Sequence, residues 1–259
     1  MLVDSHCHLD KLDLTEYGGD LGAAIAAARE AGVEKMLCIG IDLENIDAVL
    51  KLALQHEGVF ASVGVHPLYR ESREPKLDDL LQLAQQPKVV AIGETGLDYF
   101  YGDGDLQWQR DRFDVHIAAS NTTGLPLIVH TRGAKQDTLA QLRQLNRKQS
   151  SGVLHCFTED LDMAKQAVDM GFLISISGIV TFRNAADLRA VVKALPLDSL
   201  LVETDSPWLA PVPHRGKKNE PKFVLEVAQQ VAKEKGVSLE QVAKVTTENF
   251  FKLFSKAAK

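Results

Sequence analysis

The sequence lacks any long apolar run that is free of charged residues, so a membrane-spanning helix is not expected. It also lacks a basic N-terminal region followed by an apolar stretch, and we therefore expect no secretory signal peptide. Cysteine is scarce, with three residues at Cys7, Cys38 and Cys156. An odd number of widely spaced cysteines argues against a disulfide framework and is typical of reduced thiols in a cytoplasmic protein.

Basic residues are fewer than acidic ones: the chain has 29 Lys and Arg residues and 35 Asp and Glu residues, which gives a formal net charge of -6. This balance argues against strong non-specific binding to DNA or to anionic membranes, since like charges repel at long range. It does not exclude a nucleic-acid substrate, because bound divalent cations or a local basic loop can make a pocket positive. We expect no membrane partner and no obligate protein partner.

No glycine-rich phosphate loop follows the first apolar run, which weakens the alternative of a doubly wound open sheet. Instead, short apolar runs alternate with amphipathic stretches along the whole chain. Strands that are apolar throughout and separated by helices indicate a parallel sheet covered on both faces. Eight such units in about 250 residues predict an α/β fold, the (β/α)8 TIM barrel, as a single domain over residues 1–259.

The boundaries of these elements follow from the apolar pattern. The strands are predicted at Leu2–His6, Val33–Gly40, Val59–Val65, Val89–Glu94, Leu127–His130, Val153–His155, Leu173–Ser177 and Leu200–Asp205. The helices are predicted at Leu21–Ala31, Ile46–His56, Leu77–Gln85, Leu106–Thr123, Thr138–Asn146, Leu161–Met170, Ala185–Ala194, Lys222–Lys235 and Leu239–Phe254. The segment Pro207–Pro221, rich in proline and basic residues, is expected to be an irregular loop.

Residues that commonly bind metals stand at or just after the ends of the predicted strands. They are His6, His8, Glu94, His130, His155 and Asp205. Because catalytic residues of a barrel gather at the carboxyl ends of its strands, this placement predicts one metal site and a hydrolase. Side chains alternate along a strand, so His6 and His8 should point the same way while Cys7 packs on the opposite side.

Glu94 follows a fully apolar run, where a carboxylate is costly unless it is paired with a cation. Its two oxygens could bridge two metals, whereas in isolation it could also be a solvated loop acid. His130 and His155 occupy equivalent positions on consecutive strands, about 5 Å apart in the sheet direction, which suits a shared second metal.

The eighth strand of a closed barrel lies beside the first, so Asp205 should meet His6 and His8. We expect Asp205 to be a ligand that also accepts a proton from water. Glu203 should face the same interior, where it could orient a ligand, handle the proton or form a buried salt bridge.

His66 follows the third predicted strand, and we expect it to contact a substrate phosphate or to protonate the leaving group. The alternative is a buried histidine bonded to a backbone carbonyl. His116, in the middle of a predicted helix, is expected to be structural. Cationic residues in segments that follow strands could bind backbone phosphates or be ordinary surface charges. These residues are Arg132, Arg183, His214, Arg215 and Lys217. Aromatic residues beside the mouth could stack on bases or cover the rim; they are Tyr99, Phe100, Tyr101 and Trp208.

Several segments together resemble the TatD-type deoxyribonuclease family of amidohydrolase-like barrels: DSHCHLD, VGVHPLY, AIGETGLDYFY, LIVHTR, VLHCFTED, LVETDSPWLAP and NFFKLF. The resemblance covers essentially the whole chain and implies a TIM barrel with two divalent cations. It implies that one cation is held by His6, His8, Glu94 and Asp205, and the other by Glu94, His130 and His155. Mg²⁺ or Mn²⁺ is expected, although Zn²⁺ or Ni²⁺ would also suit such mixed ligands.

The resulting hypothesis is a 3'-5' exonuclease that hydrolyses phosphodiester bonds of single-stranded or frayed DNA. Its catalytic residues are expected to be Glu94, Asp205, Glu203 and His66. One alternative keeps the metals but changes the substrate, as in an esterase or deacylase acting on misacylated tRNA or on a small cyclic amide. A further alternative is a non-catalytic binding module on the same barrel, which the complete ligand set disfavours.

Overall fold

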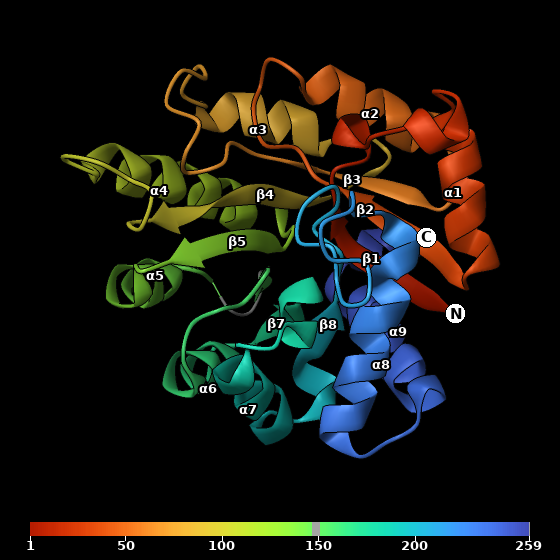
Figure 1. Cartoon of the computed structure of the whole chain (residues 1–259). Coiled ribbons are helices and arrows are strands. Elements are labelled where there is room, and N and C mark those ends of the chain that lie inside the picture. Colours follow the sequence, from red (N-terminus) through yellow and green to blue (C-terminus); the bar gives the residue numbers. More distant parts are fainter. Residues whose placement is uncertain (147–150, 259) are drawn as a thin grey trace.

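The computed structural model describes residues 1–146 and 151–258 of the chain. Within these residues, eight parallel strands form one sheet, in which sequential strands are neighbours (Figure 1). The strands are β1 Leu2–Cys7, β2 Val33–Cys38, β3 Val59–Val63, β4 Val89–Asp98, β5 Leu127–Arg132, β6 Gly152–Leu154, β7 Phe172–Ile176 and β8 Leu200–Val202. The last strand returns to the first, because the Asp205 N–H donates to the His6 carbonyl at 2.9 Å. The predicted (β/α)8 barrel is therefore confirmed.

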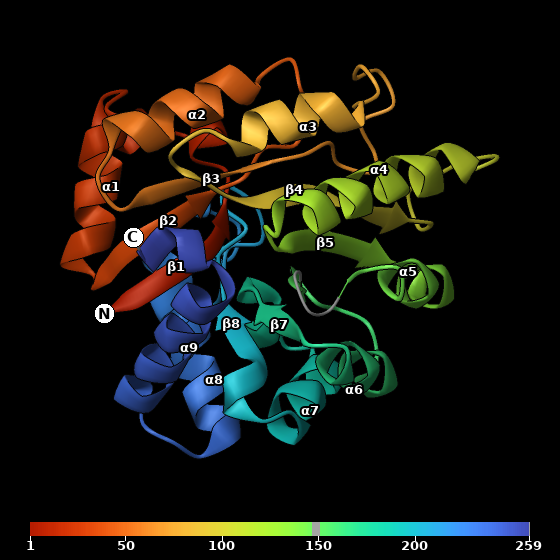
Figure 2. The same ribbon diagram turned by 180° about the vertical axis from the view of Figure 1, so that it is seen from behind.

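The helices surround the outside of the sheet (Figures 1 and 2). They are α1 Leu21–Glu30, α2 Ile46–Gln55, α3 Leu77–Ala84, α4 Gln107–Thr123, α5 Lys135–Leu142, α6 Leu161–Asp169, α7 Ala186–Ala194, α8 Val224–Lys235 and α9 Leu239–Leu253. Side-chain caps begin several of them: Asp160 accepts the Met163 N–H at α6, and Ser238 accepts the Gln241 N–H at α9. Among the described helices, none combines the length and apolar character needed to cross a membrane.

Apolar side chains fill the space on both sides of the sheet, as expected for strands that are apolar throughout. One large group packs between the barrel and its helices. A smaller group lies inside the barrel, where Phe250 of α9 and Phe254 pack with Val3 and Phe60. Because Val3 and Phe60 stand near the amino ends of their strands, α9 closes that end of the barrel. The opposite end, formed by the carboxyl ends of the strands, remains for the site.

Two strand boundaries differ from the prediction in a way that changes the site. Strand β4 continues four residues past Glu94 to Asp98, so Glu94 lies within the strand and not at its end. Gly96 permits this extension, because a Cβ at that position would lie 2.0 Å from the His130 carbonyl oxygen of β5. Conversely, β8 ends at Val202, and Asp205 lies in the following turn with a φ of 56°.

One helix is also shifted relative to the prediction. Helix α5 begins at Lys135 and ends at Leu142, whereas Thr138–Asn146 was expected. The Thr138 side chain is buried, and its hydroxyl lies 3.0 Å from the Thr131 hydroxyl of β5. The hydroxyl therefore ties the middle of the helix to the barrel instead of starting the helix.

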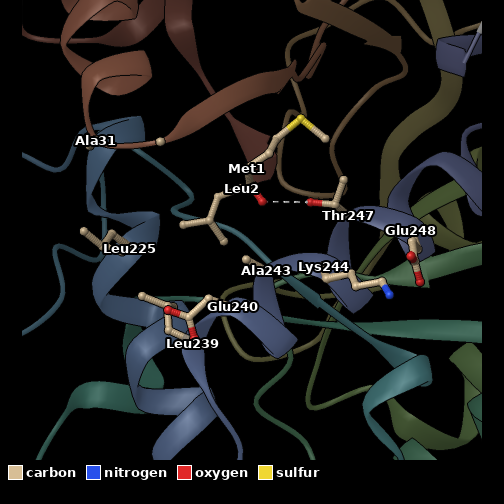
Figure 3. A pocket seen from close by; sticks show the side chains of 11 residues that line it. Met1, Leu2, Ala31, Leu225, Leu239, Glu240, Ala243, Lys244, Thr247 and Glu248 are labelled. Atoms are coloured by element: carbon tan, nitrogen blue, oxygen red, sulfur yellow. Dashed lines mark hydrogen bonds between the residues drawn. The ribbon is translucent and has the colours of Figure 1, made fainter.

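A cavity of about 530 Å³ lies at the amino end of β1, opposite the carboxyl ends of the strands. Figure 3 shows its lining, with Leu2, Leu225 and Ala243 pointing into it and a hydrogen bond from Thr247 to the Met1 carbonyl. Since Leu2 opens the strand that carries His6 near its other end, this cavity is separate from the predicted metal site.

Candidate metal centre

Glu94 is the centre of the site. Its Oε1 lies 2.8 Å from His155 Nε2, 3.3 Å from His66 Nε2 and 3.4 Å from His130 Nδ1. Its Oε2 lies 3.3 Å from His6 Nε2. One buried carboxylate is thus surrounded by four imidazole rings that come from widely separated parts of the chain.

The second part of the site surrounds Asp205. Its Oδ1 lies 3.6 Å from His6 Nε2 and 3.5 Å from His8 Nε2. The rings of His6 and His155 are stacked with centroids 3.8 Å apart, so the two parts are contiguous. The six residues expected as ligands therefore lie together, and we refer to His6, His8, Glu94, His130, His155 and Asp205 as the ligand cluster.

Backbone hydrogen bonds between neighbouring strands fix the positions of these side chains. The Glu94 N–H donates to the Gly40 carbonyl at 2.9 Å, and the His155 N–H donates to the Val129 carbonyl at 3.0 Å. Cys7, between the two N-terminal histidines, is fully buried and its thiol donates to the Leu37 carbonyl at 3.4 Å. The convergence of the ligand cluster is consequently a property of barrel closure and not of local sequence.

Two acidic residues that the sequence analysis did not single out also belong to the site. Asp98 Oδ2 lies 2.9 Å from His130 Nε2, so this nitrogen carries the proton and the Nδ1 lone pair faces Glu94. Asp4 is completely buried and accepts the N–H of Thr204 at 2.9 Å together with its hydroxyl. An acidic residue within a fully buried strand was the available signal in both cases.

Glu203 contacts His155 on the side of the ring that faces away from Glu94. Its Oε1 accepts the Cys156 N–H at 2.7 Å and lies 3.4 Å from His155 Nδ1. The side chain is fully buried, whereas that of Asp205 is 15% exposed. This arrangement suits Glu203 for orienting His155 and leaves Asp205 as the acid nearer to solvent.

His66 follows β3, and its Nε2 lies 3.3 Å from Glu94 Oε1. The Leu68 N–H donates to His66 Nδ1 at 3.1 Å, so in the neutral ring the proton is on Nε2, which faces Glu94. A nitrogen that carries a proton donates hydrogen bonds to anions and does not bind a metal. His66 is thus arranged as a donor beside the ligand cluster.

Helix α4 holds the segment that carries His66. Arg112 donates to the His66 carbonyl at 2.7 Å, and His116 Nε2 accepts the Val65 N–H at 3.0 Å. His116 Nδ1 lies 2.8 Å from the Arg112 carbonyl. Burial lowers the pKa of His116 to about 4, so the ring is neutral at pH 7 and its role is structural, as the sequence suggested.

Electrostatics within the ligand cluster are set by opposing effects. Burial raises the pKa of Glu94, but the neighbouring His155 and His66 together with the hydrogen bonds outweigh it and hold this pKa well below the usual value. Burial lowers the pKa of His155, yet Glu94 and Glu203 raise it well above the usual value. Glu94 is therefore ionised, and its negative charge favours the binding of a cation in the site.

The donor atoms fit divalent cations. His6, His8 and Asp205 offer ligand atoms within 4.8 Å of one another, as do His6, His155 and Glu203. Glu94 and His130 lie within the same distance of each other, with the protonated Nε2 of His66 beside them as a hydrogen-bond donor. Among the described side chains, the ring nitrogens of His6 and His155 and the Oε2 of Glu203 are buried and make no hydrogen bond of ordinary geometry, although His155 Nε2 lies 2.8 Å from Glu94 Oε1. Buried polar atoms without partners are costly, and a cation would satisfy these nitrogens.

The cationic residues expected to bind substrate have varied surroundings. Arg132 lies against the rings of Phe100 and Tyr101, with its guanidinium carbon 4.3 Å and 4.7 Å from the ring centroids. Arg183 and Lys217 are exposed.

The loop after β8 turns two of the expected cations toward other elements. His214 lies 2.8 Å from Glu226 of α8 and stacks on Phe223, so its ring is directed to the helix and not to Glu94. The Arg215 guanidinium carbon lies 3.7 Å from the Phe182 ring centroid. The structure therefore brings Arg132 to the edge of the ligand cluster but does not bring His214 there.

An eight-stranded parallel barrel whose catalytic end carries this set of histidines and carboxylates is a metal-dependent hydrolase. Residues 3–255 match the family model described as TatD related DNase. The chain belongs to this family, as the sequence resemblance indicated.

Relatives with similar sequences agree with this assignment. The metal-dependent hydrolase YcfH of Escherichia coli K12 is 48% identical over 98% of this chain and 95% of its own length. The metal-dependent hydrolase YabD of Bacillus subtilis is 37% identical over 98% of this chain and 99% of its own. Among solved structures, the TatD homologue YjjV of Escherichia coli K12 superposes with a TM-score of 0.90 at 30% identity, covering 98% of both chains.

Proposed function

We propose that this protein is a two-metal deoxyribonuclease that removes nucleotides from the 3' end of single-stranded or frayed DNA. The observation that carries the proposal is Glu94, one buried carboxylate with imidazole nitrogens 2.8 Å to 3.4 Å from its oxygens. His6, His8, Glu94 and Asp205 would hold one cation, and Glu94, His130 and His155 would hold the other. Shared carboxylates and phosphate substrates favour Mg²⁺ or Mn²⁺.

Divalent cations bound in this centre supply a water of lowered pKa and positive charge beside the phosphoryl oxygens. Asp205 accepts the proton of the attacking water, since it is the more exposed acid, while Glu203 keeps His155 oriented. His66 donates from Nε2 to the phosphate or to the leaving oxygen. Arg132 lies on the rim, where it can bind a neighbouring phosphate.

The family description, TatD related DNase, supports DNA as the substrate. A barrel mouth admits a strand end more readily than an intact duplex, which supports the preference for single-stranded ends. The reduced cysteines fit a cytoplasmic location, which is part of the same proposal. An esterase or deacylase acting on misacylated tRNA or a cyclic amide remains the competing function, because the same ligands would serve it.

The test is a nuclease assay on 5'-labelled single strands, frayed duplexes and blunt duplexes, with EDTA or with Mg²⁺, Mn²⁺, Zn²⁺ or Ni²⁺. The proposal expects a ladder of products shortened from the 3' end, dependent on metal and strongest on single strands. Glu94→Gln should remove the activity. Parallel assays on misacylated tRNA and cyclic amides identify the competing function if they alone show turnover.

A further inference from the structure

Exposed aromatic side chains gather at the catalytic end of the barrel. Tyr69, Phe100, Tyr101 and Trp208 are exposed and all stand in loops that follow strands. Phe100 and Tyr101 are the most open of these, with 64% and 61% exposure, and their ring centroids lie 4.8 Å apart. Two adjacent rings left in water at the mouth of a site suggest a binding surface.

The two rings are fixed relative to the ligand cluster through one carboxylate. Asp98 Oδ1 accepts the backbone N–H of Phe100 at 3.0 Å and of Tyr101 at 2.8 Å. Its other oxygen lies 2.9 Å from His130 Nε2. The loop that presents the rings therefore shares its anchor with a member of the ligand cluster, which pre-organises the rings beside it.

A cation completes this surface. Arg132 stands two residues after His130 on β5, so both side chains point to the same face of the strand. In the part of the chain that the structure describes, its guanidinium contacts the two aromatic rings and forms no ion pair. A guanidinium stacked on rings keeps its N–H groups at the edge, where they can bind a phosphate.

We propose that Phe100, Tyr101 and Arg132 form a nucleotide subsite next to the cleaved phosphate. The two ring planes stand at 88° to each other, so an unpaired base stacks on the face of one ring and meets the edge of the other, while Arg132 binds the phosphate of the same nucleotide. The aromatic rings match a planar base and the guanidinium matches the phosphate attached to it, whereas a base within an intact duplex cannot present its face to the rings. The subsite rests on the proposed nuclease function and adds a preference for unpaired, base-bearing ends.

Stacking can be observed directly with a single-stranded oligonucleotide that carries 2-aminopurine near its 3' end, because stacking quenches the fluorescence of this base. The Glu94→Gln background keeps the probe intact. We expect quenching on binding, and a loss of quenching with roughly tenfold weaker affinity when Phe100→Leu and Tyr101→Leu are added. Leu54→Ala is the control, since Leu54 is an exposed apolar residue on α2, away from the mouth. Unchanged quenching in the double variant would overturn the subsite.

A kinetic test separates the subsite from the nuclease function. The wild type should cleave a normal 3' end with kcat/KM at least about fivefold above that of an end with an abasic tetrahydrofuran residue, and Phe100→Leu should narrow this gap. The Leu54→Ala control should retain the full difference in kcat/KM between normal and abasic ends. If normal and abasic ends are cleaved equally by the wild type, the subsite is wrong while the nuclease function stands. If no DNA is cleaved, both are wrong.

Discussion

At the scale of single residues, Asp98 has a larger role than its sequence context indicates. One of its oxygens holds His130 and the other holds the loop at Phe100 and Tyr101. Its hydrogen bond, together with that of Glu94, raises the pKa of His130 against the lowering effect of burial. A partner of this kind fixes the tautomer and orientation of a metal ligand, and its removal typically weakens metal binding by about 10- to 100-fold.

Asp98→Asn tests this role. The amide oxygen can still accept one hydrogen bond, so we expect a folded protein whose affinity for Mn²⁺ falls by about tenfold or more. Calorimetric titration with Mn²⁺ measures the affinity, and thermal unfolding checks the fold. Asp47→Asn, a change at an exposed residue of α2, is the matched control. Equal affinities in the two variants would mean that Asp98 acts on the loop alone.

At the scale of elements, apolar runs were sufficient to place all the strands, but not the ends of β4 and β8. The Glu94 carboxylate interrupts the apolar run Val89–Gly93, yet the strand continues to Asp98. The interruption is tolerated because imidazoles surround the carboxylate, and the continuation depends on Gly96 passing close to β5. Both causes are tertiary contacts, which a linear pattern does not contain.

Gly96→Ala tests the dependence of β4 on this close approach. The added Cβ would lie 2.0 Å from the His130 carbonyl oxygen, and φ at this residue is 126°, so β4 must move away from β5. We expect a loss of more than about 3 kcal/mol in the free energy of unfolding, measured with urea, and loss of hydrolase activity.

Gly104→Ala provides the comparison for this substitution. Its φ is 73°, but nothing lies within 4 Å of the added Cβ, so only backbone strain of about 1 kcal/mol is expected. Similar losses in the two variants would show that the contact with β5 is unimportant.

At the scale of the whole molecule, barrel closure explains why the ligand cluster could be predicted and its supporting residues could not. His6 and Asp205 are distant in sequence, but strand order alone makes them neighbours. The contacts of Asp4 with Thr204, and of Arg112 with His66, depend on side-chain directions across different elements. No spacing rule connects those pairs, so only the structure identifies them.

Acid stability of the molecule should depend on His116. Its pKa is about 4 in the folded protein and near 6.5 when unfolded, so between these values the unfolded chain binds more protons. The contribution of this residue is therefore complete above pH 6.5 and decreases by about 3 kcal/mol as the pH falls to 4. The His116→Gln variant should be less stable than the wild type at pH 7. Its free energy of unfolding, measured with urea, should fall less steeply between pH 6.5 and pH 4. Parallel pH profiles for the two proteins would contradict this role.

Metal binding should stabilise the fold as a whole, because the ligand cluster joins residues of β1, β4 and β5 to residues that follow β6 and β8. A ligand that binds the folded state alone stabilises it by about 2.7 kcal/mol at one hundred times its dissociation constant. We therefore expect EDTA to lower the Tm of the wild type and Mn²⁺ to restore it. Glu94→Gln, which removes the charge between the imidazoles, should show little response to either. A Tm that EDTA and Mn²⁺ leave unchanged in the wild type would mean that the cluster holds no cation strongly enough to matter for folding.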